Sequence, residues 1–419
     1  MLMSAGGLSI VDQAAVSAGN FGTGVILARS VDQPTFAVFV LATTLPFIVL
    51  QLQYGLLMNP MTVNGAALHD ADFGRLVKAN AWLQSAFTVV AGVVLVGVVV
   101  VSEPLRPVLL PLLVLSTLWQ VQEFCRRVLY ARAEIRAALL NNVLNYDVQV
   151  ALMLIAVVLG LLTLELALWL AAVTSLAASI LGFWQVRRHF EVAHIDVQTA
   201  ARESFHIGKW TGATAAIVAV GQQATPLLLA ALAGLPSAAV LGVLNQLLGP
   251  TNLLGRPLQN YFTPVAIRAL SLERTQGLNR VLRHAVLVTL PAYAAYTLVL
   301  AIVPGLFLSV VYGTRYIDHA DELRLFSIVQ LIGFGVPALT VELATRRMQK
   351  QVFWGHTLFA VLEYSIGALL TVRFGLIGLI WGLGLALVAQ IALYASAVIR
   401  ARVADRRANL EAVVVSTSP

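Results

Sequence analysis

Twelve apolar stretches of about 20 residues occupy most of this 419-residue chain, and each is long enough to cross a hydrocarbon core of about 30 Å. Backbone amides cannot stay unpaired in lipid, so we expect these stretches to be helices. Only 11% of the residues are charged and the mean hydropathy is +0.85, which excludes an ordinary soluble domain. The prediction is an all-α polytopic membrane protein. Its stretches run roughly over 9–28, 35–57, 80–101, 107–129, 138–162, 164–184, 207–231, 238–262, 284–308, 322–344, 354–372 and 376–399.

Basic residues gather in every second gap between these stretches. The even-numbered gaps and the C-terminal tail hold 21 of the 27, the odd gaps hold five, and Arg256 lies inside the eighth stretch. Basic loops stay on the cytoplasmic side, so both termini are predicted to be cytoplasmic. This segregation explains the net charge of +7 without a nucleic-acid partner. The longest outside gap is only Tyr312–Asp321, which leaves no external domain for chemistry.

An internal repeat is predicted from prolines and basic residues in corresponding places. Pro34 and Pro60 bracket the second stretch as Pro236 and Pro264 bracket the eighth, and Arg75-x-x-Lys78 corresponds to Arg280-x-x-Arg283. The offsets lie between 202 and 205 residues. Six helices per half is an even number, so the two lobes are parallel and should surround a central cleft. The predicted domains are residues 1–190 (first lobe), 191–206 (an amphipathic cytoplasmic linker), 207–400 (second lobe) and 401–419 (a cytoplasmic tail).

Polar residues recur with helical spacing inside several stretches. The stripes are Asn245, Gly249, Asn252, Arg256 and Gln259 in the eighth; Gln13, Ser17, Asn20 and Gly24 in the first; Thr211, Thr214, Gln222 and Thr225 in the seventh; and Gln51 and Gly55 in the second. Two interpretations stay open for them: hydrogen bonds between helices, or a shared hydrated cleft. For Arg256 the alternatives are snorkelling to the inner interface and contact with an anion in the cleft.

Other charged residues divide into coupling candidates and residues expected at helix ends. Glu363 and His356 lie two turns apart on one helical face and are candidates for ion coupling, although a protonated Glu363 bonded within the bundle is equally open. Asp12, Asp147 and Glu342 are expected to be solvated or helix-end residues. Arg126 and Arg127 are expected to anchor their helix at the inner headgroups, with contact to an anionic lipid as the alternative.

Catalytic and metal-binding patterns are missing from the sequence. The seven histidines are scattered, no Gly-x-x-x-x-Gly-Lys motif occurs, and the single cysteine, Cys125, excludes an internal disulfide. We therefore expect no enzyme activity, no metal and no cofactor.

Several short motifs resemble the polysaccharide (O-antigen type) flippases of the multidrug/oligosaccharidyl-lipid/polysaccharide exporter superfamily. They are Gly19-Asn20-Phe21 through Leu27-Ala28-Arg29, Phe36-x-x-Phe39, Phe205-His206-Ile207-Gly208-Lys209-Trp210, Phe307-Leu308 with Val311-Tyr312-Gly313, and Phe374-Gly375 with Gly378. The resemblance covers most of the chain. It implies that the first, second, seventh and eighth helices line the cleft.

The resemblance also implies a function: alternating access that flips an undecaprenyl-pyrophosphate-linked oligosaccharide across the bacterial plasma membrane. Arg256 would then meet the pyrophosphate, and the sugar would meet Asn20, Gln51, Asn245, Asn252 and Gln259. Membrane lipids are further partners, and contact with a polysaccharide polymerase or glycosyltransferases is left open. The alternatives are a multidrug or cation antiporter of the same superfamily, and a membrane polysaccharide polymerase or ligase.

Overall fold

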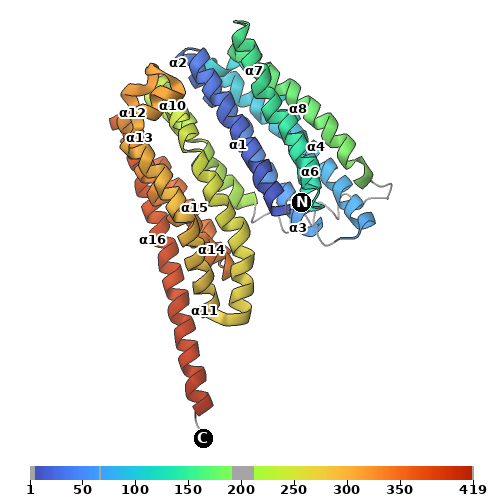
Figure 1. Ribbon diagram of the computed structural model, residues 1–419. Helices are drawn as coiled ribbons and strands as arrows, with labels where there is room; N and C mark the ends of the chain where they lie inside the picture. The colour runs from blue at the N-terminus through green and yellow to red at the C-terminus, as the bar shows by residue number, and fades with distance from the viewer. Residues whose placement is uncertain (1–4, 66–67, 191–211, 418–419) are drawn as a thin grey trace. The chain divides into compact units, whose positions relative to one another are not determined.

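The computed structural model describes residues 5–65, 68–190 and 212–417, and all the regular structure in that part of the chain is helical (Figure 1). The chain divides into two compact units, Met1–Gln246 and Leu247–Pro419. The predicted linker, 191–206, lies outside the described residues, so the predicted lobe boundary remains a prediction.

The first unit contains the first seven apolar stretches, and their described residues are helical except for residues 159–162 and Ala224. Its elements are α1 (Ala5–Ser30), α2 (Gln33–Gln53), the π-helical turn η1 (Tyr54–Met58), α3 (Asn59–Gly65), α4 (Asp70–Val101), η2 (Glu103–Val108), α5 (Leu109–Ala131), α6 (Ile135–Asn142), the π-helical η3 (Val143–Asp147), α7 (Val148–Val158), α8 (Leu164–Val186), η4 (Arg187–His189), a helical segment at 212–218, the π-helical η5 (Ala219–Gln223) and most of α10 (Thr225–Leu248).

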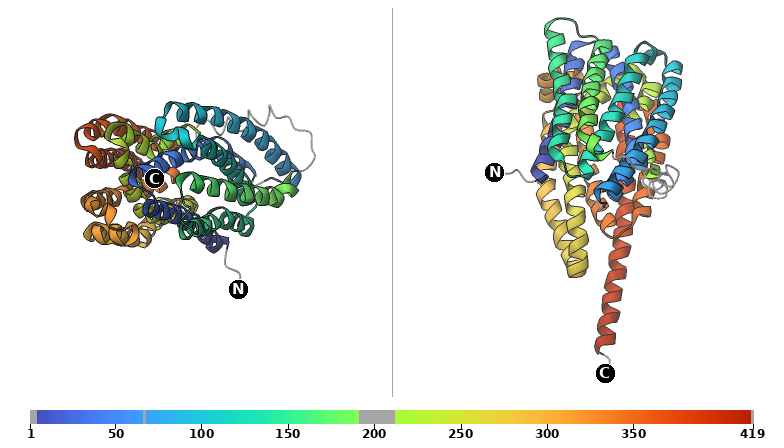
Figure 2. Two further views of the ribbon diagram at one scale, coloured as in Figure 1. Left: turned by 90° about the horizontal axis from the view of Figure 1, so that it is seen from above. Right: turned by 90° about the vertical axis from the view of Figure 1, so that its right-hand side faces the viewer.

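The second unit contains two very long helices. Its elements are α11 (Pro250–Ile302), α12 (Pro304–Tyr312), η6 (Thr314–His319), α13 (Ala320–Gly333), α14 (Gly335–Thr345), α15 (Gln349–Leu362), the π-helical η7 (Glu363–Gly367) and α16 (Ala368–Thr417). Figure 1 shows α11 turning back on itself. The predicted tail continues α16 as helix, and in Figure 2 it runs well beyond the place where α11 turns back.

Nine helical segments of the described chain are long and apolar enough to cross a membrane. Two of them, Gly212–Leu248 and Gln349–Asp405, bend at a glycine with positive φ, Gly234 or Gly375. Each of these two segments therefore contains parts of two predicted stretches. Glycine fits these bends because it lacks the Cβ that makes a positive φ unfavourable.

Capping residues explain where two of the membrane helices begin. The Asp32 carboxylate accepts a hydrogen bond from the Thr35 amide at 3.2 Å at the start of α2. The Thr163 hydroxyl accepts one from the Leu166 amide at 3.1 Å at the start of α8. Both caps satisfy amides that have no partner within their own helix.

Backbone conformation supports the predicted parallel repeat. Ala133 and Arg347 are the two non-glycine residues with positive φ in the described chain, and they lie 214 residues apart at the ends of α5 and α14. Gly160 and Gly375, also with positive φ, lie 215 apart. The sequence Val-Leu-Asn-Tyr-Asp-Val from Val143 resembles Val-Leu-Glu-Tyr-Ser-Ile from Val361, and each overlaps a π-helical turn. These offsets are larger than the 202 to 205 residues of the predicted repeat. The nine residues of α12 account for the difference, because they lie after Pro264 and before Arg347 in the second half of the chain.

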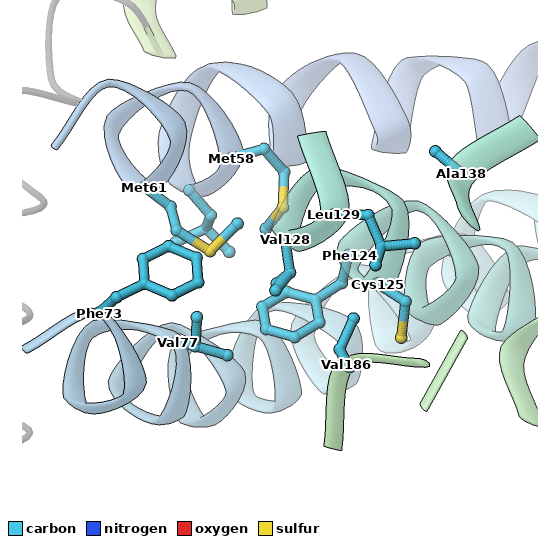
Figure 3. Packing of buried hydrophobic residues seen from close by; sticks show 11 residues of the cluster. Met58, Met61, Phe73, Val77, Phe124, Cys125, Val128, Leu129, Ala138 and Val186 are labelled. Atoms are coloured by element: carbon cyan, nitrogen blue, oxygen red, sulfur yellow. The ribbon is translucent and has the colours of Figure 1, made fainter. Parts of the chain in front are cut away.

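An apolar core fixes one end of the first unit. Figure 3 shows Met58 from η1, Met61 from α3, Phe73 and Val77 from α4, and Phe124 from α5 packed together. Leu57, Val128, Leu129, Ala138, Val186 and the thiol of Cys125 complete the cluster. The predicted orientation places this end of the unit on the cytoplasmic side, and the core sets the rotation of α5 there.

Candidate functional site

Polar side chains inside the membrane helices of the first unit fall into two groups. Those of the first group bond other helices. Gln53 of α2 donates to Gln84 Oε1 of α4 at 2.9 Å and to the Gln120 carbonyl of α5 at 2.9 Å. Gln149 donates to Thr23 Oγ1 at 3.0 Å, and Ser175 donates to Asn145 Oδ1 at 2.8 Å. These bonds match the interpretation of polar residues as contacts between helices.

The second group makes no hydrogen bond to another helix. Asn20 is exposed, and its amide donates only to the Val16 carbonyl of its own helix, at 3.0 Å. Gln51 is half-buried and Asn245 is exposed, and neither side chain forms a hydrogen bond within the described residues. An amide left bare in hydrocarbon costs several kcal/mol, so these three predicted substrate-binding residues are expected to face water.

The other three predicted substrate-binding residues are Asn252, Arg256 and Gln259. They belong to α11, and their side chains lie outside the described part of the structure. The choice between snorkelling and anion contact for Arg256 therefore stays open.

A charged cluster at one end of the first unit was not predicted. Glu123 of α5 pairs in a bidentate manner with Arg126, through Nε at 2.7 Å and Nη2 at 2.9 Å, and it also accepts from Arg127 Nε at 2.6 Å. Asp12 of α1 is 0% exposed; it accepts from the Tyr130 hydroxyl and from Asn142 Nδ2, the latter at 2.6 Å. Arg126 Nη1 lies 3.8 Å from the same carboxylate.

This cluster corrects two sequence predictions. Asp12 is not solvated, because three side chains from α5 and α6 surround its carboxylate. Arg126 is not a simple headgroup anchor, because its side chain is only 13% exposed and is paired inside the unit. The positive charges of the two arginines balance the negative charges of the two carboxylates. Buried charges in proteins are normally paired in this way. The Glu123-x-x-Arg126-Arg127 spacing was a sequence signal for the pairing, since residues three and four apart meet on a helix.

A second charged cluster, within the other unit, shows that Glu342 is not solvated, although it does lie near a helix end, three residues before the end of α14. This carboxylate is 2% exposed, and it accepts from Arg346 Nε at 3.1 Å and from Arg402 at 2.9 and 2.6 Å. Arg346 also donates to Asp405 Oδ2 at 2.7 Å. The four side chains join the end of α14 to residues 402–405 of α16. Asp147, for which the same prediction was made, is half-buried in η3.

The predicted coupling candidates lie in the second unit. Glu363 begins η7 and is 0% exposed. His356 Nδ1 accepts a hydrogen bond from Gln390 Nε2 of α16 at 3.2 Å, and the same amide donates to the Tyr394 hydroxyl at 3.1 Å. His356 is therefore bonded to α16. In the part of the chain that the structure describes, no three His, Cys, Asp or Glu side chains are grouped to hold a metal.

Comparison with known proteins gives the fold. No family profile matches the chain, and neither does any curated sequence. An inward-facing multidrug resistance MATE family transporter of the MOP superfamily matches with a TM-score of 0.77 and 12% identity, over 95% of this chain and 99% of that one. An outward-facing multidrug resistance MATE family transporter of this superfamily matches with a TM-score of 0.67 and 11% identity, over 95% and 94% of the two chains. A MATE crystal structure in the straight conformation gives the same values.

The chain thus has the all-α polytopic fold of MATE transporters of the MOP superfamily. Those transporters have twelve helices in two lobes, which confirms the predicted fold class. The structural neighbours are transporters and not enzymes.

Proposed function

We propose that this protein is an alternating-access transporter that flips a lipid-linked oligosaccharide, joined through pyrophosphate to undecaprenol, from the inner to the outer leaflet of the bacterial plasma membrane. Both termini would be cytoplasmic, as the basic gaps predict. The substrate, the surrounding lipids and the enzymes of polysaccharide assembly would be its partners.

The observation that carries this proposal is that the side-chain amides of Asn20, Gln51 and Asn245, on helices that cross the membrane, make no hydrogen bond to another helix within the described residues. Amides that make no bond to another helix are suited to sugar hydroxyls, because each amide both donates and accepts. Gln53 differs from Gln51 although it lies only two residues away. It lies on the other side of α2, is buried, and donates hydrogen bonds to α4 and α5.

The energetics do not require ATP. An inside-negative potential favours outward movement of anions by about 2.3 kcal/mol per charge per 100 mV. A pyrophosphate with about two charges would gain about 4–5 kcal/mol per 100 mV, provided that the protein's own cations stay in place.

A drug or cation antiporter is the second candidate, because the structural neighbours are multidrug transporters. Such a protein would need accessible carboxylates for its cationic cargo. Of the described membrane carboxylates, Asp12, Glu123 and Glu342 are instead buried against arginines, Glu363 is 0% exposed, and Asp147 is half-buried. This pairing favours the flippase.

Two assays separate these candidates. The protein should restore surface polysaccharide in a strain lacking its own flippase, and it should leave drug susceptibility unchanged in a strain lacking drug exporters. Gln51→Leu should reduce polysaccharide export while the amount of folded protein stays normal. Rescue of drug resistance without polysaccharide would refute the proposal in favour of the antiporter.

Ion coupling by Glu363 is tested separately. In proteoliposomes, Glu363→Gln should remove any dependence of flipping on a proton or sodium gradient. An unchanged gradient dependence would exclude Glu363 from coupling.

A further inference from the structure

Arg127 differs from its neighbour Arg126 in how its guanidinium is used. Arg126 gives Nε and Nη2 to Glu123 and places Nη1 near Asp12. Arg127 gives only Nε, at 2.6 Å, and neither of its terminal nitrogens donates a hydrogen bond within the described residues. An arginine with two free terminal amino groups keeps the planar fork that binds phosphate oxygens in pairs.

The fork of Arg127 is held in place from two sides. Glu123 fixes Nε, and the Tyr54 ring of η1 lies under the guanidinium, with 4.6 Å between its centroid and the guanidinium carbon. Tyr54 is 37% exposed and the Arg127 side chain is 26% exposed, so the fork is accessible while its stem is restrained. Restraint of this kind reduces the entropy lost when a ligand binds.

The position of Arg127 on α5 separates it from the lipid-facing side of that helix. Leu110 and Val121 are exposed and lie eleven residues apart, about three turns, so they share one face. Arg127 lies about 120° around the helix from Val121. Its contact is with Tyr54, the first residue of η1, which follows Gln51 of α2 by three residues, about one helical turn. The charged fork and the amide of Gln51 are therefore expected to lie about one turn apart along this helix, within the first unit.

The depth of Arg127 matches a phosphate and not a sugar. It lies four residues before the end of α5, about 6 Å along the axis. The headgroup layer outside the hydrocarbon core has about this thickness. The predicted orientation puts this end at the inner leaflet, where the substrate is loaded.

We propose that Arg127, with Tyr54 beneath it, binds the diphosphate of a lipid-linked substrate at the inner leaflet, one turn from the sugar-binding amide of Gln51. The proposal rests on the proposed function and adds a phosphate site in the first half of the chain. The diphosphate lipid and ordinary phospholipids both carry phosphate in their headgroups, so either could bind the guanidinium. We assign the diphosphate because the fork lies beside Gln51 and away from the lipid-facing side of α5.

The test uses the full-length protein in phosphatidylcholine nanodiscs and measures binding of undecaprenyl pyrophosphate, phosphatidylglycerol and undecaprenol. Wild type should bind the pyrophosphate lipid in preference to the other two. Arg127→Gln should weaken that binding by about tenfold or more, the value of one charged hydrogen-bonded contact. Arg127→Lys should recover part of the affinity, and Tyr54→Leu should weaken binding severalfold.

Arg126→Gln is the matched control, because it removes the same charge one residue away from a guanidinium that is already engaged. It should change the affinity by less than about threefold, as expected for an indirect electrostatic effect. Equal losses in Arg126→Gln and Arg127→Gln would overturn the proposal, since they would indicate a general field and not the fork. A loss confined to phosphatidylglycerol would overturn the assignment to the diphosphate.

Failure of this proposal and failure of the proposed function give different results. Wild type that binds no pyrophosphate lipid would refute the proposed substrate and, with it, this site. Wild type that binds while Arg127→Gln binds equally well would refute only the role of Arg127. Unfolding of each variant in mixed micelles shows whether a loss of binding is caused by misfolding. If Arg127→Gln is misfolded, the affinity of Arg127→Lys is compared with that of the wild type instead.

Discussion

Removal of the Glu123 carboxylate tests whether the charged cluster is a buried, self-neutralised unit. Glu123→Gln leaves Arg126 and Arg127 without their main partner, and Arg126 is the more buried of the two. Loss of one partner from a buried ion pair typically costs about 3–5 kcal/mol. We expect the free energy of unfolding of Glu123→Gln to fall within that range.

A double-mutant cycle divides this cost between the two arginines. Arg126 makes two bonds to Glu123, at 2.7 and 2.9 Å, so the coupling energy of this pair should be about 2–3 kcal/mol. Arg127 makes one bond and is a quarter exposed, so its coupling should be about 1 kcal/mol or less. Glu123→Gln/Arg126→Gln should consequently lose about 2–3 kcal/mol less stability than the sum of the losses in the two single variants.

The assay is reversible unfolding by dodecyl sulfate in mixed micelles, which gives the free energy of unfolding for each variant. Coupling below about 0.5 kcal/mol for Glu123 and Arg126 would refute the reasoning, because solvated surface pairs give values of this size. That result would restore the interpretation of both arginines as headgroup anchors.

Three further predictions use the same preparation. Gly382→Ala places a Cβ 2.4 Å from the backbone of η7 and should lower the melting temperature, whereas Gly97→Ala, which meets nothing within 4 Å, should leave it unchanged or slightly raised; equal melting temperatures would contradict the close packing. Cys125 is 2% exposed and should react with maleimide only after unfolding, so rapid labelling of the native protein would refute its burial. Gln53→Leu should cost about 1–3 kcal/mol because it leaves buried acceptors without a donor, and Gln51→Leu should cost much less; equal costs would remove the distinction between the two amides.

Much of the fold follows from the sequence because lipid imposes a simple rule. Stretch length and the pairing of backbone amides require membrane helices, and nearly all described residues of the apolar stretches are helical. The bends at Gly234 and Gly375 follow a local rule of the same kind. The π-helical turns η1, η3, η5 and η7 do not, because an extra residue in a helical turn depends on what packs against it.

The charged sites were harder to predict because their environment is made by distant parts of the chain. Asp12 meets Tyr130 and Asn142, which are 118 and 130 residues away, and Glu342 meets Arg402 at 60 residues. A helix-end position gives no information about such partners. The unbonded state of Gln51 and the bonded state of Gln53 also depend on which helices adjoin α2, although both are glutamines in one apolar stretch.

The pairing along α5 has a consequence for how this helix enters the membrane. Glu123 precedes Arg126 by three residues and Arg127 by four, so one turn of a newly formed helix brings the acid to both bases before any other helix has arrived. The segment therefore carries its own counter-ion through biosynthesis. The contacts from Asp12 and Tyr54, which belong to other helices, wait for tertiary assembly. An isolated α5 should therefore insert with two arginines at the cost of little more than one.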